Sequence, residues 1–268
     1  MAAEKLRLEQ IAKTFDVEGH GLAVLLPIDL CVPEGQFLTI VSPSGCGKST
    51  LFNIVAGLLP PDPGGRLTID GRVMASTLGR VGYMPQRDLL LPWRSVMENA
   101  VLGLEVQGMP RAEARGRARA MLKQFGLEAF EDFYPFALSG GMKQRVALLR
   151  TFLFESDIML LDEPFGALDA LTRSVLQEWL SEVCAKYRRT ILFITHDVEE
   201  AIFLGDRVVV MTARPGRFKL ELPVPLERPR SPEIVTTGEF VGLKRQILDA
   251  IREESLRSLA AEEGGRPS

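Results

Sequence analysis

Apolar residues recur with two different periods along the chain. Residues 5–41 show short apolar stretches that predict strands, and the last of these is the continuous run Phe37–Val41. Further continuous runs of strand length lie at 158–161, 191–194 and 208–211, and helical spacing fills the intervals between them. Strands that are apolar on both faces and alternate with helices indicate an α/β fold with a parallel sheet and crossover helices.

Two other regions have a different pattern. Residues 87–150 carry helical periodicity with little strand signal, which predicts a helical lobe inserted into the sheet domain. After residue 213 a proline-rich stretch predicts an extended connector, and apolar residues at helical spacing then predict a terminal helix. We therefore divide the chain into a main domain over 1–213 and a connector with a C-terminal helical extension over 214–268.

Composition narrows the class of protein. The chain has 268 residues, of which 46% are hydrophobic, so it can bury a sizeable core. Its net charge of −3 does not suggest the basic footprint of a nucleic-acid binder, and we expect no nucleic-acid partner. The 3 scattered cysteines favour a reducing, cytoplasmic compartment. No apolar run approaches the ~18 residues that span a bilayer, so any membrane role requires a partner.

A glycine-rich loop follows the run Phe37–Val41 directly. The segment Ser42–Thr50 matches the P-loop pattern, except that Ser42 stands where the pattern has its first glycine. We expect this departure to affect the turn and not phosphate binding. Backbone N–H groups of such a loop surround phosphates, Lys48 reaches the β- and γ-phosphates, and the Ser49 hydroxyl ligates Mg²⁺. The loop therefore predicts a nucleoside triphosphate site.

Polar side chains follow the other strands of the predicted sheet. Asp162 and Glu163 end the strand at 158–161, and His196 follows the next strand along the chain. Ligands bind at the carboxyl ends of such strands, so Asp162 would hold Mg²⁺, Glu163 would orient or deprotonate water, and His196 would contact the γ-phosphate. Gln86 closes a further strand-like stretch, where its amide could touch Mg²⁺ or water.

A second candidate anion site lies within the helical lobe. Ser139 precedes Gly140 and Gly141, and a helical apolar pattern follows them. A helix start of this kind attracts anions because its backbone N–H groups are unpaired and carry about half a positive charge. The alternative is an ordinary serine-capped helix after a glycine turn.

Taken together, these residues resemble the ATP-binding subunit of ABC transporters, over about residues 5–213 and in the family's order. The resemblance implies a P-loop NTPase (RecA-like) core with an N-terminal antiparallel β subdomain and an inserted α-helical subdomain at about 87–150. It also implies that the chain is an ATPase with ATP and Mg²⁺ as its ligands.

The resemblance assigns a role to each motif. The implied ATP-binding residues are Phe15, which would stack on adenine, and Ser42, Pro43, Ser44, Gly45, Cys46, Gly47, Lys48, Ser49 and Thr50. The implied catalytic residues are Glu163, His196 and Gln86, and the implied Mg²⁺ ligands are Ser49, Gln86 and Asp162. The signature residues, which would bind the ATP of a partner subunit, are Ser139, Gly140, Gly141 and Gln144, and Asp169 belongs to the D-loop.

In the family, two ATPase subunits face head to tail, so each ATP lies between the P-loop of one and the signature of the other. The implied partners are a second ATPase subunit, in a homodimer or alternatively a heterodimer, integral-membrane permease subunits near Gln86–Trp93, and indirectly an extracytoplasmic solute-binding protein. The implied location is the cytoplasmic face of the cell membrane. The segments Leu90–Trp93 and Thr212–Gly216, with the terminal helix, resemble the nitrate, sulfonate and taurine import group.

Two alternatives use part of the same motif set. One is a soluble ABC ATPase of DNA repair or translation, but the interval between Lys48 and Leu138 has no room for the long coiled coil that such proteins carry. The other is a P-loop kinase or nucleotide switch, which has no use for the segment Leu138–Gln144.

Overall fold

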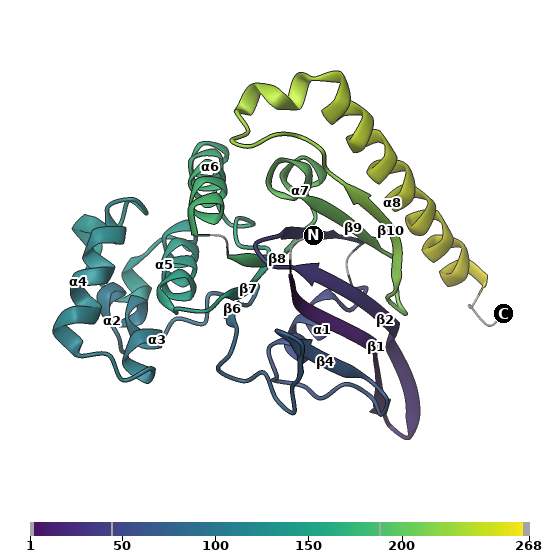
Figure 1. The fold of residues 1–268 in the computed structure, drawn as a ribbon, viewed down its shortest axis with the longest axis horizontal. Coiled ribbons are helices and arrows are strands. Elements are labelled where there is room, and N and C mark those ends of the chain that lie inside the picture. The colour runs from purple at the N-terminus through teal and green to yellow at the C-terminus, as the bar shows by residue number, and fades with distance from the viewer. Residues whose placement is uncertain (1–2, 44, 188, 265–268) are drawn as a thin grey trace.

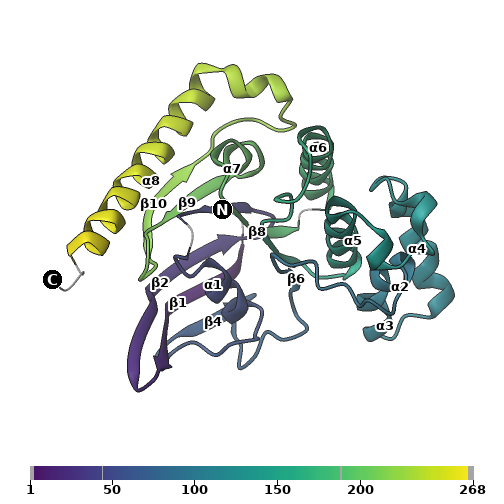
Figure 2. The ribbon, with the colours of Figure 1, turned by 180° about the vertical axis from the view of Figure 1, so that it is seen from behind.

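The computed structural model describes residues 3–43, 45–187 and 189–264. Its elements form a six-stranded sheet, a four-stranded sheet and a lobe of helices set to one side (Figures 1 and 2). The strands are β1 (Glu4–Val17), β2 (His20–Pro33), β3 (Phe37–Val41), β4 (Arg66–Ile69), β5 (Arg72–Val73), β6 (Gly82–Met84), β7 (Ile158–Asp162), β8 (Thr190–Thr195), β9 (Arg207–Met211) and β10 (Phe218–Pro223). The α-helices are α1 (Lys48–Val55), α2 (Val96–Ala100), α3 (Leu102–Val106), α4 (Arg111–Leu122), α5 (Gly140–Leu153), α6 (Ala170–Tyr187), α7 (Val198–Leu204) and α8 (Gly238–Gly264). Short 3₁₀ helices lie at η1 (Glu128–Phe130), η2 (Pro135–Ala137) and η3 (Pro232–Thr236).

The larger sheet has the strand order β10-β9-β3-β8-β7-β6, and all its pairs are parallel except β9 with β10. Strands β3, β7 and β8 are buried along their whole length, as their continuous apolar runs require. Val41 is paired with Thr195, and Asp162 with Ile194. This register brings the residues that follow β3, β7 and β8 to one edge of the sheet.

The smaller sheet, with the order β2-β1-β4-β5, is antiparallel and N-terminal, as expected. The sequence predicted several short strands here, whereas β1 and β2 are 14 residues each. The reason is an irregularity in the pairing: Gln10 has a φ of 52°, and its backbone N–H donates to the Asp29 carboxylate at 2.8 Å. The bulge interrupts the alternation of side chains while the ladder continues beyond it.

Each face of the larger sheet packs into its own apolar core. One core joins the sheet to α1 and the smaller sheet, and it includes Leu38, Phe52 and Leu160. The other core joins the opposite face to the helical lobe and to α5, α6, α7 and α8, and it includes Phe193. The phosphate-loop segment between β3 and α1 therefore starts from a strand that is covered on both sides.

The segment after β9 belongs to the larger sheet. The prolines predicted only an extended connector, yet β10 pairs with β9 in antiparallel register, and α8 packs over both strands and α7 (Figure 1). Further along, Arg230 is buried and donates hydrogen bonds to the Ile202, Phe203 and Gly205 carbonyls at the end of α7. Among the residues that the structure describes, no helix has both the length and the apolar character of a bilayer span.

Candidate active site

The loop between β3 and α1 is shaped by glycine. Gly47, directly before α1, has a φ of 100°, in the left-handed region that favours glycine. A Cβ atom at Gly47 would also lie 2.7 Å from the side chain of Leu25 in β2. The loop therefore lies close against β2 and leaves the first N–H groups of α1 available to an anion. Ser44, one of the expected ATP-binding residues, lies outside the described residues.

Lys48 is buried and turned back onto the loop. Its Nζ donates to the Ser42 hydroxyl at 2.8 Å, to the Ser42 carbonyl at 3.3 Å and to the Pro43 carbonyl at 3.2 Å. We expected the serine at position 42 to affect only the turn. Its hydroxyl instead contacts the cation that would bind phosphate, so Ser42 helps to position Lys48.

Ser49 and Asp162 form a paired oxygen site. The Ser49 hydroxyl donates to Asp162 Oδ2 at 2.8 Å, and Asp162 is 2% exposed. Burial, together with the neighbouring charge of Glu163, raises the pKa of the Asp162 carboxyl above its ordinary value, against the opposing effect of the Ser49 hydrogen bond. A hydroxyl and a carboxylate are hard oxygen donors, which fit Mg²⁺. Within the described residues, no cluster of three or more His, Cys, Asp and Glu could hold a metal alone, so phosphate or water would complete the shell.

Three candidate catalytic side chains meet at Glu163. Gln86 donates from Nε2 to Glu163 Oε2 at 3.3 Å, and His196 Nδ1 lies 3.3 Å from the same oxygen. Glu163 has a φ of 49°, which a non-glycine residue adopts only when its surroundings require it. Its backbone N–H donates to the Ile194 carbonyl at 2.9 Å, so β8 holds the residue in this conformation.

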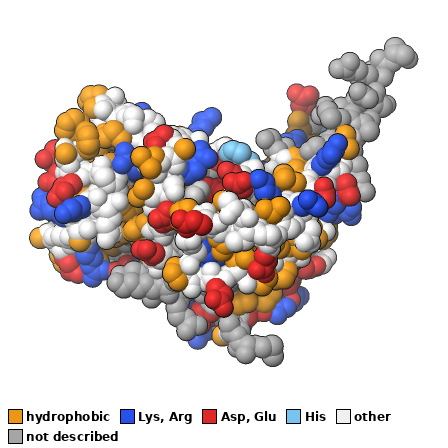
Figure 3. Space-filling view, turned by 90° about the horizontal axis from the view of Figure 1, so that it is seen from above, with side chains coloured by type: hydrophobic (Ala, Val, Ile, Leu, Met, Phe, Trp, Pro, Cys, Tyr) orange, Lys and Arg blue, Asp and Glu red, His pale blue; other side chains and the backbone are white. Residues whose placement is uncertain are grey.

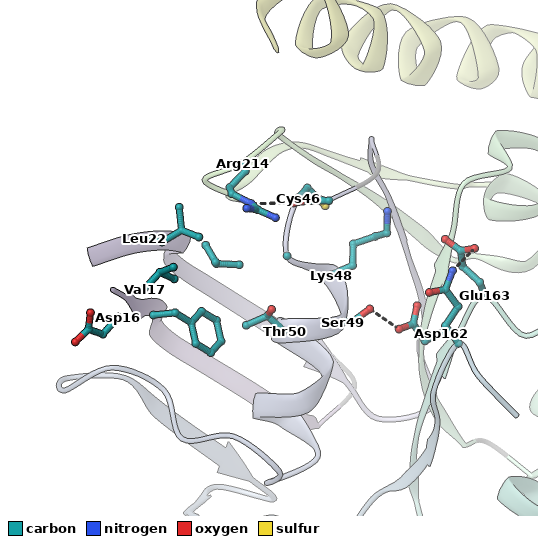
Figure 4. Close-up of a pocket in the computed structure, with 15 residues that line it drawn as sticks. Asp16, Val17, Leu22, Cys46, Lys48, Ser49, Thr50, Asp162, Glu163 and Arg214 are labelled. Atoms are coloured by element: carbon teal, nitrogen blue, oxygen red, sulfur yellow. Dashed lines mark hydrogen bonds between the residues drawn. The ribbon is translucent and has the colours of Figure 1, made fainter. Parts of the chain in front are cut away.

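A cavity of about 640 Å³ extends along the phosphate loop, and Gln86, Asp162 and Glu163 also line it. Figure 4 places Val17 and Leu22 at one end and Asp162 and Glu163 at the other, with Ser49 between them. Such a volume is in the range of sites that bury a ligand of nucleotide size. Phe15 also lines the cavity, and Lys13 Nζ lies 5.7 Å from the centroid of its ring.

The second candidate anion site lies apart from this cavity. Ser139 accepts a hydrogen bond from the Met142 N–H at 3.2 Å, which makes it the N-cap of α5, and it is exposed together with Gly140. A Cβ atom on Gly141 would lie 3.3 Å from Leu168. Among the described residues that line the cavity, none belongs to Ser139–Gly141. The start of α5 is therefore capped by Ser139 and is also exposed to a ligand outside the cavity.

Gln144 does not lie exposed with the other signature residues. It is 6% exposed, and its Nε2 donates to the backbone carbonyl of Glu163 at 3.3 Å. That Gln144 contacts the ATP of a partner stays a prediction. Gln144 lies one turn into α5, where its side chain reaches the residue that follows β7. Asp169 is exposed near the start of α6, and the hydrogen bond from the Thr172 N–H lowers the pKa of its carboxyl.

Sequence reasoning missed two polar residues of the cavity, Asp16 and Arg214. Arg214 lines it, and its Nε donates to the Gly45 carbonyl at 3.2 Å. The residue lies in the Thr212–Gly216 motif, which we had used only to compare families. Its distance of 169 positions from Gly45 explains why spacing gave no signal.

Comparisons with known proteins agree with this geometry. A family model described as ABC transporter matches residues 25–166. An uncharacterised ABC transporter ATP-binding protein of Methanocaldococcus jannaschii is 45% identical over 255 residues, which cover 95% of this chain and 94% of that protein. A taurine import ATP-binding protein of Rhizobium johnstonii is 41% identical, with 90% of each chain covered. A formylaminopyrimidine import ATP-binding protein of Halalkalibacterium halodurans is 38% identical, with 96% and 100% covered.

Solved structures give the same result. A structure described as the dimeric form of a bacterial ABC transporter cassette aligns with a TM-score of 0.76 and 30% identity, covering 83% of this chain and 100% of that one. A post-hydrolysis state of that cassette, bound to ADP and Pi, aligns with the same TM-score of 0.76. These likenesses confirm the expected P-loop NTPase architecture. The chain therefore belongs to the ABC transporter family, as one of its ATP-hydrolysing ATP-binding subunits.

Proposed function

We propose that this subunit works as one half of a dimer that powers the import of a small solute through a separate permease. The observation that carries the proposal is the separation of the two anion sites. The cavity contains Lys48 and the acids Asp162 and Glu163, whereas Ser139 caps α5 outside it. A second chain in head-to-tail orientation would bring its own Ser139 to this cavity. The dimeric state described for the similar cassette supports this arrangement.

We assign the chemistry as follows. Lys48 and the N–H groups at the start of α1 bind the phosphates, and Phe15 packs against the base. Glu163 accepts a proton from the attacking water, and the hydrogen bond from Gln86 and the contact with His196 hold the carboxylate in place. When bound at Ser49 and Asp162, Mg²⁺ would neutralise charge on the transferred phosphoryl group. Ser139, Gly140 and Gly141 would bind the γ-phosphate of the partner's ATP.

A groove beside the helical lobe is the proposed docking site for the permease. It has a volume of about 250 Å³, and its rim includes Leu58 and Leu78, which are 58% and 64% exposed. Arg150 also lines it and donates to the backbone carbonyls of Asp88 and Leu89, which follow Gln86 in the chain. A permease helix in this groove would therefore press on the segment that carries Gln86. Such docking places the subunit peripherally at the cytoplasmic face of the membrane.

The solute class is proposed from the relatives. The named relatives are import proteins for taurine and formylaminopyrimidine. We propose a small solute of the nitrate, sulfonate or taurine kind, which a solute-binding protein would deliver to the permease. Charged side chains of both signs are mixed over the face seen in Figure 3, so this face gives no support to a DNA-repair role.

A mixing experiment tests the shared site. Lys48→Ala removes the phosphate-binding cation, and Ser139→Arg blocks the signature, so each variant alone should lose ATPase activity. A mixed dimer contains one intact site, formed by the P-loop of the Ser139→Arg chain and the signature of the Lys48→Ala chain. Activity should therefore recover when the two are mixed. A mixture that stays inactive, or a Ser139→Arg protein that is fully active alone, would contradict the proposal.

The transport role is tested separately. The tagged subunit should capture a membrane protein from solubilised membranes, and Leu78→Glu should abolish the capture while leaving basal ATPase activity intact. The captured complex in liposomes should hydrolyse ATP faster when taurine and the solute-binding protein are added. Capture of the same protein by the Leu78→Glu variant would remove the groove from the docking role.

A further inference from the structure

We propose that Arg214 binds the phosphate chain of the nucleotide, so that a residue from outside the P-loop completes the phosphate site. The inference rests on the proposed function, since it takes the cavity to be the ATP site. Arg214 lies in the loop Thr212–Gly216 between β9 and β10, far in sequence from the P-loop.

The loop Thr212–Gly216 is hydrogen-bonded to the smaller sheet. The Gly216 N–H donates to the Val24 carbonyl at 2.8 Å, and the Leu26 N–H donates to the Gly216 carbonyl at 2.9 Å. These two bonds attach the loop to β2, the same strand that packs against Gly47 of the P-loop.

The loop also touches the P-loop itself. A Cβ atom built on Gly216 would lie 2.1 Å from the Cys46 carbonyl oxygen, so only glycine fits at this approach. Thr212 also makes hydrogen bonds across the loop. Its hydroxyl donates to the Pro215 carbonyl at 3.1 Å and accepts from the Arg217 N–H at 3.1 Å. The position of residue 214 is thus set before any ligand arrives, which lowers the entropic cost of a contact from it.

The side chain of Arg214 is directed at the phosphate loop. Its Nε donates to the Gly45 carbonyl at 3.2 Å, and the residue lines the cavity above the loop (Figure 4). Within the part of the chain that the structure describes, no hydrogen bond is made by its two Nη groups. A guanidinium held by one nitrogen at a carbonyl still offers a planar pair of donors, which suits phosphate oxygens.

The location favours the phosphates over the base. The carbonyl that holds Arg214 belongs to Gly45, inside the loop whose N–H groups face the phosphates. The cavity also contains the carboxylates of Asp162 and Glu163, which repel an anionic ligand in the absence of a cation. Besides Lys48, Arg214 is the positive side chain among the described lining residues, so it offsets this repulsion.

Binding of two probes to the full-length protein tests the proposal. ADP carries base, ribose and phosphates, whereas inorganic tripolyphosphate carries only the phosphate chain. Calorimetric titration should show about five- to tenfold weaker binding of both probes to Arg214→Ala and Arg214→Met, and a smaller loss for Arg214→Lys. Arg217→Ala is the matched control, since Arg217 is exposed directly before β10 and does not line the cavity; it should bind both probes like the wild type.

Other results of these titrations would contradict the inference or the proposed function. Unchanged affinities in Arg214→Ala and Arg214→Met would overturn the inference, and so would a loss for ADP with none for tripolyphosphate, which indicates a base contact. Thermal unfolding of both Arg214 variants without ligand should match that of the wild type, because the side chain is exposed. If Arg214→Ala alone has a lower unfolding midpoint, the affinities of Arg214→Met decide the test. Wild-type protein that binds neither probe would instead overturn the proposed function and this inference with it.

Discussion

Gln144 donates a hydrogen bond from Nε2 to the backbone carbonyl of Glu163, over 3.3 Å. The two residues belong to different motifs, and the bond joins the helix that begins after Ser139 to the residue that would activate water. Glu163 also has a φ of 49°, which a non-glycine residue adopts only when its surroundings require it. A ligand at the start of α5 would thus be linked through Gln144 to the proposed catalytic carboxylate of the same chain, at the site where that chain binds its own ATP.

Replacement of Gln144 should separate turnover from nucleotide binding. Gln144→Ala removes the side-chain donor to the Glu163 carbonyl, which still accepts from the Gly166 N–H, so the loss of stability is about 0.5–1.5 kcal/mol, and it frees the carboxylate to move. We expect a clearly lower kcat with little change in the dissociation constant of ADP. Steady-state ATPase kinetics and calorimetry measure the two. Lys143→Ala, which removes a side chain at the neighbouring position of α5, should keep wild-type kcat; equal losses in both variants would point to a general weakening of α5.

Glu163→Gln should bind ATP and hydrolyse it slowly. The amide keeps the shape of the side chain but cannot accept a proton, and loss of a general base costs about 10²- to 10⁴-fold in rate. With ATP retained, the dimer should persist and elute earlier in size-exclusion chromatography. His196→Ala is the comparison, since it removes one contact to the carboxylate and leaves the base. Hydrolysis by Glu163→Gln at the wild-type rate would exclude Glu163 as the base.

Glu200→Gln should change the pH dependence of stability. Glu200 is 6% exposed, and burial raises the pKa of its carboxyl above the ordinary 4.5, although hydrogen bonds with Thr195 and Gln177 oppose the shift. An acid with a raised folded pKa lowers stability as pH rises from its unfolded pKa through its folded pKa. Above that window the native state carries a buried charge.

The variant has no such charge to bury. Thermal unfolding should therefore show Glu200→Gln to be more stable than the wild type at neutral pH, with a difference that shrinks on acidification and vanishes below about pH 4.5. Glu182→Gln removes an exposed carboxylate from α6 and controls for the change in net charge. A stability difference that stays constant with pH would mean that ionisation of Glu200 is not its source.

Gly216→Ala should weaken nucleotide binding, although Gly216 lies far from the P-loop in sequence. Its Cβ atom would lie 2.1 Å from the Cys46 carbonyl, so either the loop or the P-loop must shift. We expect weaker ADP binding, and a loss of stability of about 1–3 kcal/mol from overpacking. Gly242→Ala is the control, because a Cβ atom there meets open space within α8. Unfolding curves measure the stability of both variants, and titrations measure their affinity for ADP. Normal ADP binding by Gly216→Ala would show that the P-loop tolerates the shift.

The parts of the fold that could be predicted are those set by local pattern. The continuous apolar run Phe37–Val41 predicts a buried strand, and the glycine-rich segment after it predicts the loop, because each signal lies within a few residues. The carboxyl ends of β7 and β8 could be placed together from the rule for parallel sheets alone. Their register, with Asp162 beside Ile194, then brings Glu163 and His196 into contact.

The parts that could not be predicted depend on contacts between distant residues. The bulge at Gln10 breaks the alternation that a strand shows in sequence, so β1 was expected to be shorter. The prolines after residue 213 favoured a connector over the strand β10, although an edge strand tolerates proline. The inward direction of Gln144 follows from how α5 packs on the sheet, and Arg214 reaches Gly45 only because β2 and the loop after β9 lie side by side.

The pairing of β10 with β9 has a practical consequence for protein engineering. A recombinant fragment that stops at residue 213, the boundary suggested by the motifs, would cut the sheet and not a linker. It would expose one backbone edge of β9, whose residues Val208–Met211 are fully buried. An apolar strand with an unpaired edge is a template for intermolecular pairing. We expect such a fragment to aggregate during expression, whereas fusions placed beyond α8 should leave the protein soluble.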